Sequence, residues 1–167
     1  MARYWIDADV FIQSKNGLYS FELAPPFWVF LDKQVEAGTI RSSTKIYDEL
    51  LKREDKKDKL AQWIKHRRTG GMFVEPAEEV QEIYRQIADH TSDKYSKRRA
   101  KVAEFLSGGD GWIIAHAKHD GGTVVSHETR TDPSALKPKI PNVCTQFGVP
   151  CIDLAVMLSA LKFKFVA

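Results

Sequence analysis

Hydrophobic positions along the chain recur with two different periods, and their alternation predicts an α/β fold. Short β-branched and aromatic runs at residues 3–7, 39–42, 123–126 and 149–152 are typical of strands. The segments between them place apolar residues three or four positions apart, as amphipathic helices do. Strands separated by helices predict a mostly parallel sheet covered by helices. The predicted helices cover residues 10–14, 27–37, 45–53, 54–68, 76–90, 93–106, 110–117, 141–147 and 154–161.

The composition predicts one soluble domain that spans residues 1–167. The chain has 167 residues, of which 43% are hydrophobic and 28% charged, and its net charge is +3. Its two cysteines, Cys144 and Cys151, exclude a disulfide-rich scaffold and a four-thiolate zinc site. No apolar run approaches the roughly 20 residues of a membrane-spanning helix, and the first residues lack the apolar core of a signal peptide. We therefore expect a cytoplasmic protein with no membrane partner.

Acidic residues follow several of the predicted strands. Asp7 and Asp9 come directly after the first strand, and Glu128 follows the third. Glu49 lies in the helix after the second strand, and Asp110 begins a later helix. The ligand site of a parallel sheet lies outside the carboxyl ends of its strands. We therefore expect these acids to converge at one edge of the sheet.

Clustered carboxylates indicate a divalent cation. Carboxylates that lie close together repel and raise one another's pKa unless a cation is present. Mg²⁺ and Mn²⁺ prefer hard oxygen ligands and bridge to phosphate oxygens. Such a site activates water and stabilises an in-line phosphoryl displacement. The acids therefore predict a Mg²⁺ or Mn²⁺ site for chemistry at a phosphate.

Two other residue types are weaker candidates for metal ligands. His116 and His119 lie three residues apart on one predicted helix, but no third soft ligand and no HExxH pattern accompanies them. We expect them to be core or surface residues. Cys144 and Cys151 lack CxxC spacing and are expected to be buried small hydrophobic residues.

Four segments, in order along nearly the whole chain, resemble the motifs of PIN domains. The run WIDADVFI at residues 5–12 resembles the opening PIN strand, and IYDEL at residues 46–50 resembles the PIN helix that ends in Glu-Leu. The run DGWIIAHA at residues 110–117 resembles the third motif, an Asp followed by an Ala-rich helix. The run VVSHE at residues 124–128 resembles the strand-ending motif of Thr, one residue and Asp. Residues 141–144 and 148–154 are similar to a PIN-like subfamily related to VapC-type toxins.

This resemblance implies a Rossmann-like α/β/α sandwich with a short parallel sheet. It also implies a Mg²⁺- or Mn²⁺-dependent endoribonuclease, with RNA as its substrate. Matched by position, the acids that hold the metal and catalyse the reaction are Asp7, Glu49, Asp110 and Glu128. The resemblance further implies the toxin role of a toxin–antitoxin pair, with an antitoxin protein as partner and a homodimer as assembly.

Three positions depart from the family pattern. Asp9 stands where the family more often has Asn, which adds a negative charge. Ser126 replaces Thr and keeps a hydroxyl that can bond a neighbouring acid. Glu128 replaces Asp and is one methylene longer, so its role can pass to a water-mediated contact or to Asp132. Asp9, Ser126 and Asp132 are therefore predicted to support the metal-binding acids.

Two other functions stay open. Asp7-Ala-Asp9 also resembles the nucleophile motif of haloacid dehalogenase-type phosphatases, in which Asp7 is phosphorylated and Asp9 is the acid–base. Ile114 counts against this, because it stands where that family's Gly-Asp-x-x-x-Asp motif needs an acid. The other alternative is a catalytically inactive PIN-like module that binds RNA or protein, against which the four retained acids argue.

A basic run at residues 94–101 is a candidate RNA contact. It holds five basic residues and no acid. When the four candidate acids are set aside, 25 basic residues against 18 acids leave a charge of +7, which suits a nuclease with an acidic pocket. Such a run is usually a solvated helix face. The alternative predicts contacts with the RNA backbone from Lys97, Arg98 and Arg99.

Overall fold

Five parallel strands form one sheet. The computed structural model describes residues 2–129 and 136–165. Every strand pair is parallel, and the order across the sheet is β3-β2-β1-β4-β5. The expected α/β class with a parallel sheet is therefore confirmed. The strands are β1 (Tyr4–Ile6), β2 (Ile40–Ser43), β3 (Phe73–Val74), β4 (Thr123–Val125) and β5 (Cys151–Ile152).

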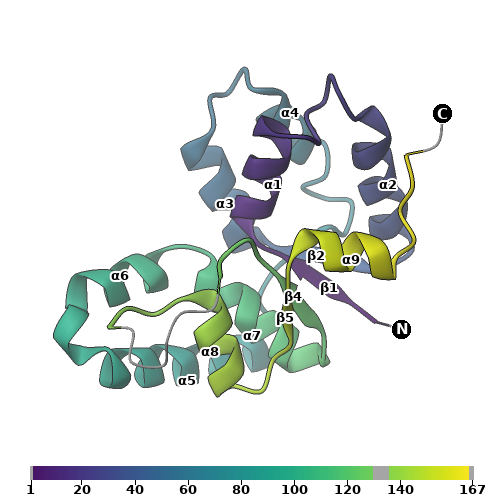
Figure 1. The fold of residues 1–167 in the computed structure, drawn as a ribbon. Coiled ribbons are helices and arrows are strands. Elements are labelled where there is room, and N and C mark those ends of the chain that lie inside the picture. The colour runs from purple at the N-terminus through teal and green to yellow at the C-terminus, as the bar shows by residue number, and fades with distance from the viewer. Residues whose placement is uncertain (1, 130–135, 166–167) are drawn as a thin grey trace.

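Helices cover both faces of this sheet, which gives three layers. In Figure 1, α1, α2, α4 and α9 lie above the sheet, and α5, α6, α7 and α8 lie below it. The helix α3 follows β2 directly and contacts both α1 and α7. None of the helices in the described ranges combines the length and the apolar character needed to cross a bilayer. The helices are α1 (Ala8–Asn16), α2 (Pro25–Glu36), α3 (Thr44–Arg53), α4 (Lys59–Lys65), α5 (Glu78–Lys94), α6 (Arg99–Ser107), α7 (Asp110–Asp120), α8 (Ile140–Gln146) and α9 (Leu154–Ala160), with a 3-10 turn η1 (Ser96–Arg98) before α6.

The order of the strands reverses between β1 and β4. The chain adds β2 and β3 on one side of β1 and then returns to add β4 and β5 on the other side. Ligands of open α/β sheets bind outside the carboxyl ends of the strands at such a reversal. Asp7 follows β1 directly, and Ser126 follows β4 directly. The topology therefore places the carboxyl ends of β1 and β4, and with them Asp7 and Ser126, at the expected ligand position.

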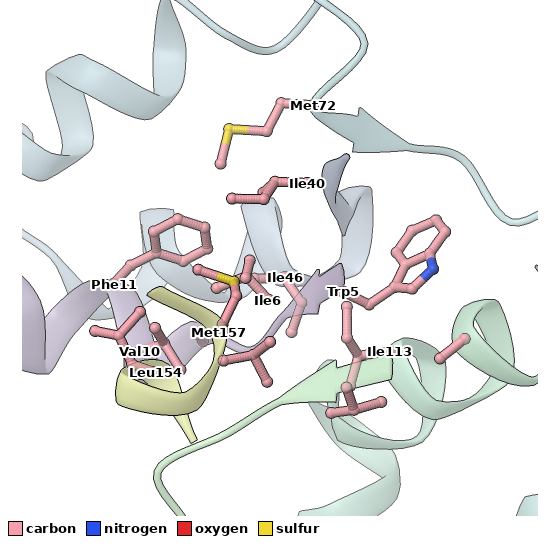
Figure 2. Packing of buried hydrophobic residues seen from close by; sticks show 14 of the residues in the cluster. Trp5, Ile6, Val10, Phe11, Ile40, Ile46, Met72, Ile113, Leu154 and Met157 are labelled. Atoms are coloured by element: carbon pink, nitrogen blue, oxygen red, sulfur yellow. The ribbon is translucent and has the colours of Figure 1, made fainter. Parts of the chain in front are cut away.

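The side chains of β1 alternate between the two helical layers and join both halves of the core. Trp5 faces α7, where its indole stacks on the His116 ring with the centroids 4.5 Å apart. Ile6 lies on the opposite side, among side chains that include Phe11 and Met157 (Figure 2). All five side chains are almost completely buried. Burial of each large apolar side chain contributes about 1.5–3 kcal/mol to stability.

The histidines occupy core and surface positions, as expected. His116 is buried, and its Nε2 lies 3.2 Å from the Ser43 hydroxyl oxygen. Burial lowers the pKa of His116 to about 4, so its ring is neutral at neutral pH. His119 is exposed at the end of the same helix. The pair therefore does not converge on a shared ligand.

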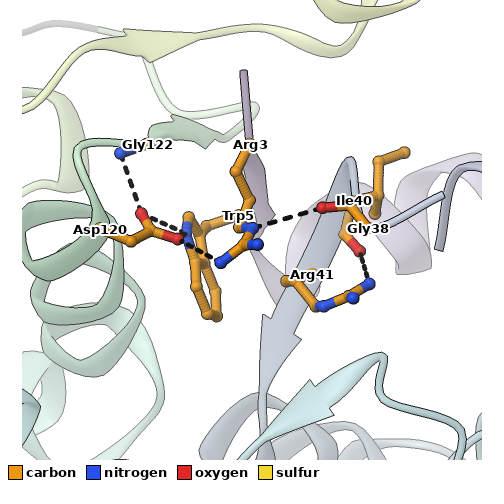
Figure 3. Close-up of polar contacts among 7 residues, drawn as sticks. All are labelled: Arg3, Trp5, Gly38, Ile40, Arg41, Asp120 and Gly122. Carbon is orange, nitrogen blue, oxygen red and sulfur yellow. Dashed lines mark hydrogen bonds and ion pairs between the residues drawn. The ribbon is translucent and has the colours of Figure 1, made fainter. Parts of the chain in front are cut away.

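A polar network at the amino end of β1 holds the start of the sheet in place (Figure 3). The Asp120 carboxylate accepts hydrogen bonds from the Trp5 indole at 3.0 Å, from Arg3 at 3.1 Å and from the Gly122 N–H at 2.9 Å. A β-carbon at Gly122 would lie 2.9 Å from the Arg3 carbonyl oxygen, so only glycine fits there without a shift of the backbone. Because one end of β1 is held this way, the position of Asp7 at its other end is well defined.

Three parts of the predicted element order were wrong. The structure adds a fifth strand, β3, whose two residues are too few to show an alternating pattern. The predicted helix over residues 54–68 shortens to α4, because the Asp58 carboxylate accepts the Leu60 N–H at 2.7 Å and caps a new helix start. The predicted helix over residues 93–106 is also divided, since α5 extends to Lys94 and α6 begins at Arg99.

Candidate functional site

Asp7 lies at the carboxyl end of β1 and is buried. Its backbone N–H donates to the Val125 carbonyl oxygen at 3.1 Å, which continues the pairing of β1 with β4. The backbone is extended at Asp7 and turns into α1 at the next residue. Only 2% of Asp7 is exposed. The sheet and the start of α1 together hold this carboxylate at the reversal of strand order.

Two glycines make room for the carboxylate of Glu49. Glu49 lies on α3, and its Oε2 accepts a hydrogen bond from the Gly109 backbone N–H at 2.9 Å. A β-carbon at Gly109 would lie 3.1 Å from this oxygen and would overlap the Ile46 side chain, and one at Gly108 would lie 3.3 Å from the same oxygen. A larger residue at Gly109 would therefore push α3 away from the start of α7. Asp110, the first residue of α7, comes directly after this glycine pair.

The predicted acids lie close enough to act on one another electrostatically. Burial raises the pKa of Asp7 well above its ordinary value, and the charges of Asp110, Asp9 and Glu49 raise it further. Burial also raises the pKa of Asp110, and the charges of Glu49, Glu128 and Asp9 add to this effect. Asp9, Glu49 and Glu128 therefore lie in the electrostatic neighbourhood of Asp7 or Asp110.

Arg53 neutralises the outer part of this acid cluster. Its guanidinium donates to Asp9 Oδ1 at 2.9 Å and to Glu49 Oε1 at 3.3 Å. Both ion pairs are partly exposed, and such pairs contribute about 0.2–1 kcal/mol each. Across the described part of the chain, no lysine or arginine forms a salt bridge with Asp7 or Asp110. Among the described residues, Asp7 and Asp110 therefore have no paired cation. Asp9 and Glu49 share the Arg53 guanidinium, which a metal ion can displace.

Glu128 has a structural contact in addition to its place near Asp110. Its Oε2 accepts a hydrogen bond from the Ile140 N–H at the start of α8, at 2.8 Å. The Glu128 backbone N–H donates to the Ser126 hydroxyl oxygen at 3.1 Å. The Ser126 hydroxyl therefore bonds the backbone of Glu128 and stabilises the turn after β4. The sequence had predicted that this hydroxyl bonds a carboxylate. Asp132, the alternative to Glu128, lies outside the described residues.

The chemistry of this donor set fits a hard divalent cation. The cluster consists of carboxylate oxygens, and its two inner members have raised pKa values and no ion-pair partner, which is the environment that Mg²⁺ or Mn²⁺ stabilises. Within residues 2–129 and 136–165, no three His, Cys, Asp or Glu side chains are already placed to hold a metal ion. Mutual repulsion opposes a closer approach of carboxylates that have no cation between them. Asp7, Glu49 and Asp110 are the residues that would hold the ion.

Three cavities flank the acid cluster, and two of them have both basic and acidic residues in their lining. On the Glu49 side lies a cavity of about 610 Å³, which we name the Trp112 cavity. On the other side lies a cavity of about 110 Å³, lined by Asp110, Glu128 and three lysines. A further cavity of about 600 Å³ lies beyond Glu128, at the ends of β4 and β5. The Trp112 cavity includes Lys45, Glu49, Lys52, Arg53, Gly108 and Trp112, and the lysines of the second cavity are Lys101, Lys137 and Lys139.

The predicted RNA contacts lie outside these cavities. Lys97, Arg98 and Arg99 are exposed on η1 and at the start of α6. Arg99 lines a separate cavity of about 410 Å³, whose lining includes none of the four acids. From the same basic run, Lys101 lines the cavity of Asp110 and Glu128. A role of Lys97, Arg98 and Arg99 in RNA binding stays a prediction.

Sequence reasoning missed three residues that shape the site. Gly108 and Gly109 accommodate the Glu49 carboxylate, and Arg53 pairs with two of the acids. Both features had a signal in the sequence. The glycine pair stands directly before Asp110, and Arg53 follows Glu49 by four residues, the spacing of an ion pair on one helix face.

The chain belongs to the family described as "Domain of unknown function (DUF4411)", whose model matches residues 4–165. The match spans every strand and helix of the sandwich. No curated protein and no solved structure matches the chain significantly. Family membership therefore covers the whole fold, and the interpretation of the site rests on its residues and their geometry.

The raised pKa of Asp7 predicts that Asp7→Asn stabilises the metal-free protein. A carboxyl whose pKa is higher in the folded state than in the unfolded state loses stabilising free energy as the pH rises through the folded-state value. At pH 8, we expect the Asp7→Asn variant to melt about 2–6 °C above the wild type in EDTA. The difference should shrink towards pH 4, where the wild-type carboxyl keeps its proton.

Thermal unfolding followed by circular dichroism checks this expectation, and Asp93→Asn is the matched control because Asp93 is exposed on α5. Saturating Mn²⁺ should stabilise the wild type and leave the Asp7→Asn variant unchanged. A lower melting temperature for Asp7→Asn in EDTA at pH 8 would show that Asp7 is a stabilising residue, and would contradict the interpretation.

Proposed function

We propose that this protein is a metal-dependent endoribonuclease of the PIN type, which hydrolyses phosphodiester bonds of RNA. Asp7, Glu49 and Asp110 hold Mg²⁺ or Mn²⁺, and Glu128 helps to place the reacting groups. The observation that supports this most strongly is the electrostatic coupling of acids from four separate segments near the reversal of strand order. The resemblance of the four motifs to those of PIN domains supports the same assignment.

The chain supplies fixed carboxylates for this chemistry. When bound, the divalent ion lowers the pKa of a water that attacks phosphorus, and it neutralises charge on the scissile phosphate. Asp7 is held by the β1–β4 pairing, and Glu49 by the Gly109 N–H, so both need little reorganisation. Glu128 uses Oε2 to cap α8, which leaves Oε1 to orient the attacking water. Cleavage of the bond from phosphorus to the 3′ oxygen gives a 5′-phosphate and a 3′-hydroxyl.

The phosphatase alternative receives less support from the geometry. Its mechanism requires Asp9 as an acid–base, and this carboxylate is paired with Arg53. Ile114, which stands at the position of the missing acid, is fully buried on α7. Covalent trapping of a phosphate on Asp7 would favour this alternative.

The toxin role, the antitoxin partner and the homodimer come from the resemblance to VapC-type toxins. In such a pair the antitoxin is a separate chain. These three points stay predictions alongside the nuclease proposal, and the assay of cleavage by the isolated chain does not depend on them.

Cleavage of a mixed-structure RNA by the purified protein tests the proposal. We expect cleavage with Mn²⁺ or Mg²⁺ and none with EDTA. Asp7→Asn and Asp110→Asn should each lower the rate by about 100-fold or more, because each removes a preorganised charge from the reaction centre. Asp93→Asn should cleave like the wild type, and circular dichroism should show that all variants are folded.

Two results would overturn the nuclease assignment. One is a folded wild-type protein that cleaves no RNA with either metal, which would favour the binding-module alternative. The other is metal-dependent cleavage that persists unchanged in both acid variants, which would place the reaction elsewhere or indicate a contaminating nuclease.

The ion pairs of Arg53 predict that replacing this residue changes the affinity for a metal ion. Arg53 and a metal ion compete for Glu49, so Arg53→Met should tighten Mn²⁺ binding by about twofold to thirtyfold, the range of two partly exposed ion pairs. Isothermal titration with Mn²⁺ alone measures this affinity. Lys52→Met is the matched control, since Lys52 is an exposed neighbour on α3 that has no ion pair with these acids. Weaker Mn²⁺ binding by Arg53→Met would contradict the competition.

A further inference from the structure

The Trp112 cavity contains an aromatic surface beside the acid cluster. Trp112 lies on α7, two residues after Asp110, and is half-buried. It lines the same cavity of about 610 Å³ as Glu49 and Arg53. The nuclease proposal assigns no role to this tryptophan. Its position connects an aromatic ring with the residues proposed to hold the metal.

The indole of Trp112 is held rigidly from one side. The Tyr84 ring stacks on it with the centroids 3.7 Å apart and the planes inclined by 3°. The Tyr84 hydroxyl donates to the Leu106 carbonyl oxygen at 2.8 Å, which fixes the supporting ring. A β-carbon at Gly111 would lie 3.0 Å from Tyr84 Cε2, so this glycine allows the ring to pack close to α7. The result is a fixed two-ring platform at the edge of the site.

The other face of Trp112 meets a cation. The Lys45 ammonium lies 5.4 Å from the centroid of the indole ring, and we assign it to the face opposite Tyr84, because the Tyr84 ring covers its own face with the centroids 3.7 Å apart. A ligand can displace the lysine from the aromatic ring, because a cation–π contact at a partly exposed site contributes only about 0.5–1 kcal/mol. A stacked base contributes about 1–3 kcal/mol. A base can therefore replace the ammonium on this face.

The charges of the cavity become suited to phosphate once the acids hold a cation. Its lining includes the basic residues Lys45, Lys52 and Arg53 and the acidic residues Asp48, Glu49 and Glu104. With a divalent ion on Glu49, the positive charges at the cavity outnumber the negative ones. Lysines beside an aromatic platform are the arrangement with which proteins hold single-stranded nucleic acid.

We infer that the Trp112 cavity is a nucleotide subsite for single-stranded RNA. A base stacks on Trp112, and Lys45 and Lys52 contact the phosphates of that nucleotide. That this nucleotide flanks the scissile bond rests on the proposed function. Because a base stacks on the platform only after it leaves a duplex, this subsite selects unpaired substrate.

Binding of RNA without cleavage tests the subsite. The probe is a fluorescein-labelled 12-nucleotide single-stranded RNA of mixed sequence, followed by fluorescence anisotropy in saturating Ca²⁺, a hard cation that takes carboxylate ligands. We expect Trp112→Leu to weaken binding by roughly 5- to 100-fold, the effect of one base–aromatic stack, and Trp112→Phe to keep most of the affinity. A duplex RNA of the same length should bind Trp112→Leu and the wild type equally.

The lysines are tested by the salt dependence of the same binding. Replacement of both Lys45 and Lys52 by Met should reduce the slope of log affinity against log salt by about 1.4, which corresponds to two phosphate contacts on a single strand. The matched control replaces Lys33 and Lys65 by Met, because both are exposed on helices away from the cavity. This control should keep the wild-type slope.

The outcomes separate this inference from the nuclease proposal. Trp112-dependent binding without cleavage under any metal would support the subsite and overturn the nuclease. Metal-dependent cleavage with unchanged binding by a folded Trp112→Leu variant would overturn the subsite alone. A wild-type protein that does not bind the single-stranded probe in saturating Ca²⁺ would also overturn the subsite, whatever the cleavage assay shows.

Discussion

Two carboxylates, the buried Asp7 and the half-buried Asp110, are the constraint on which this site depends, since neither forms a salt bridge within residues 2–129 and 136–165. Asp7 and Asp110 come from distant segments of the chain and act on each other electrostatically near the point where the strand order reverses. Their burial and their acidic neighbours raise the pKa of both groups. Carboxylates that lie near one another without a cation lower the stability of the fold, and a bound cation offsets this loss. The functional interpretation follows from this imbalance of charge.

The rest of the fold keeps these carboxylates in place. At the amino end of β1, Asp120 joins Arg3, Trp5 and Gly122 in one network, and the opposite end of the strand presents Asp7. Glycines act at the points of closest approach, since Gly122 lets the chain pass β1 without overlap, and Gly109 admits the Glu49 carboxylate. Rigid strands and short backbone approaches thereby place the acids more precisely than loops would.

The sequence predicted the fold class because it rests on local patterns, and the same patterns selected the candidate acids. A short hydrophobic run ends at Asp7 and predicts a strand there. Asp110 stands before an apolar segment that predicts a helix. The strand β3 was not visible, because two residues show no period. The contacts of Arg53 and the platform of Trp112 on Tyr84 were not predicted either. These depend on how α3, α5 and α7 pack together, which a linear pattern does not contain.

A crystal structure of the protein soaked with Mn²⁺ tests the central claim most directly, because the anomalous signal locates the ion without any assumption about substrate. The account predicts an anomalous peak within coordination distance of the Asp7, Glu49 and Asp110 carboxylates, with the Arg53 guanidinium displaced from Glu49. A map with no peak at these carboxylates at saturating Mn²⁺, or with the ion held by other residues, would contradict it.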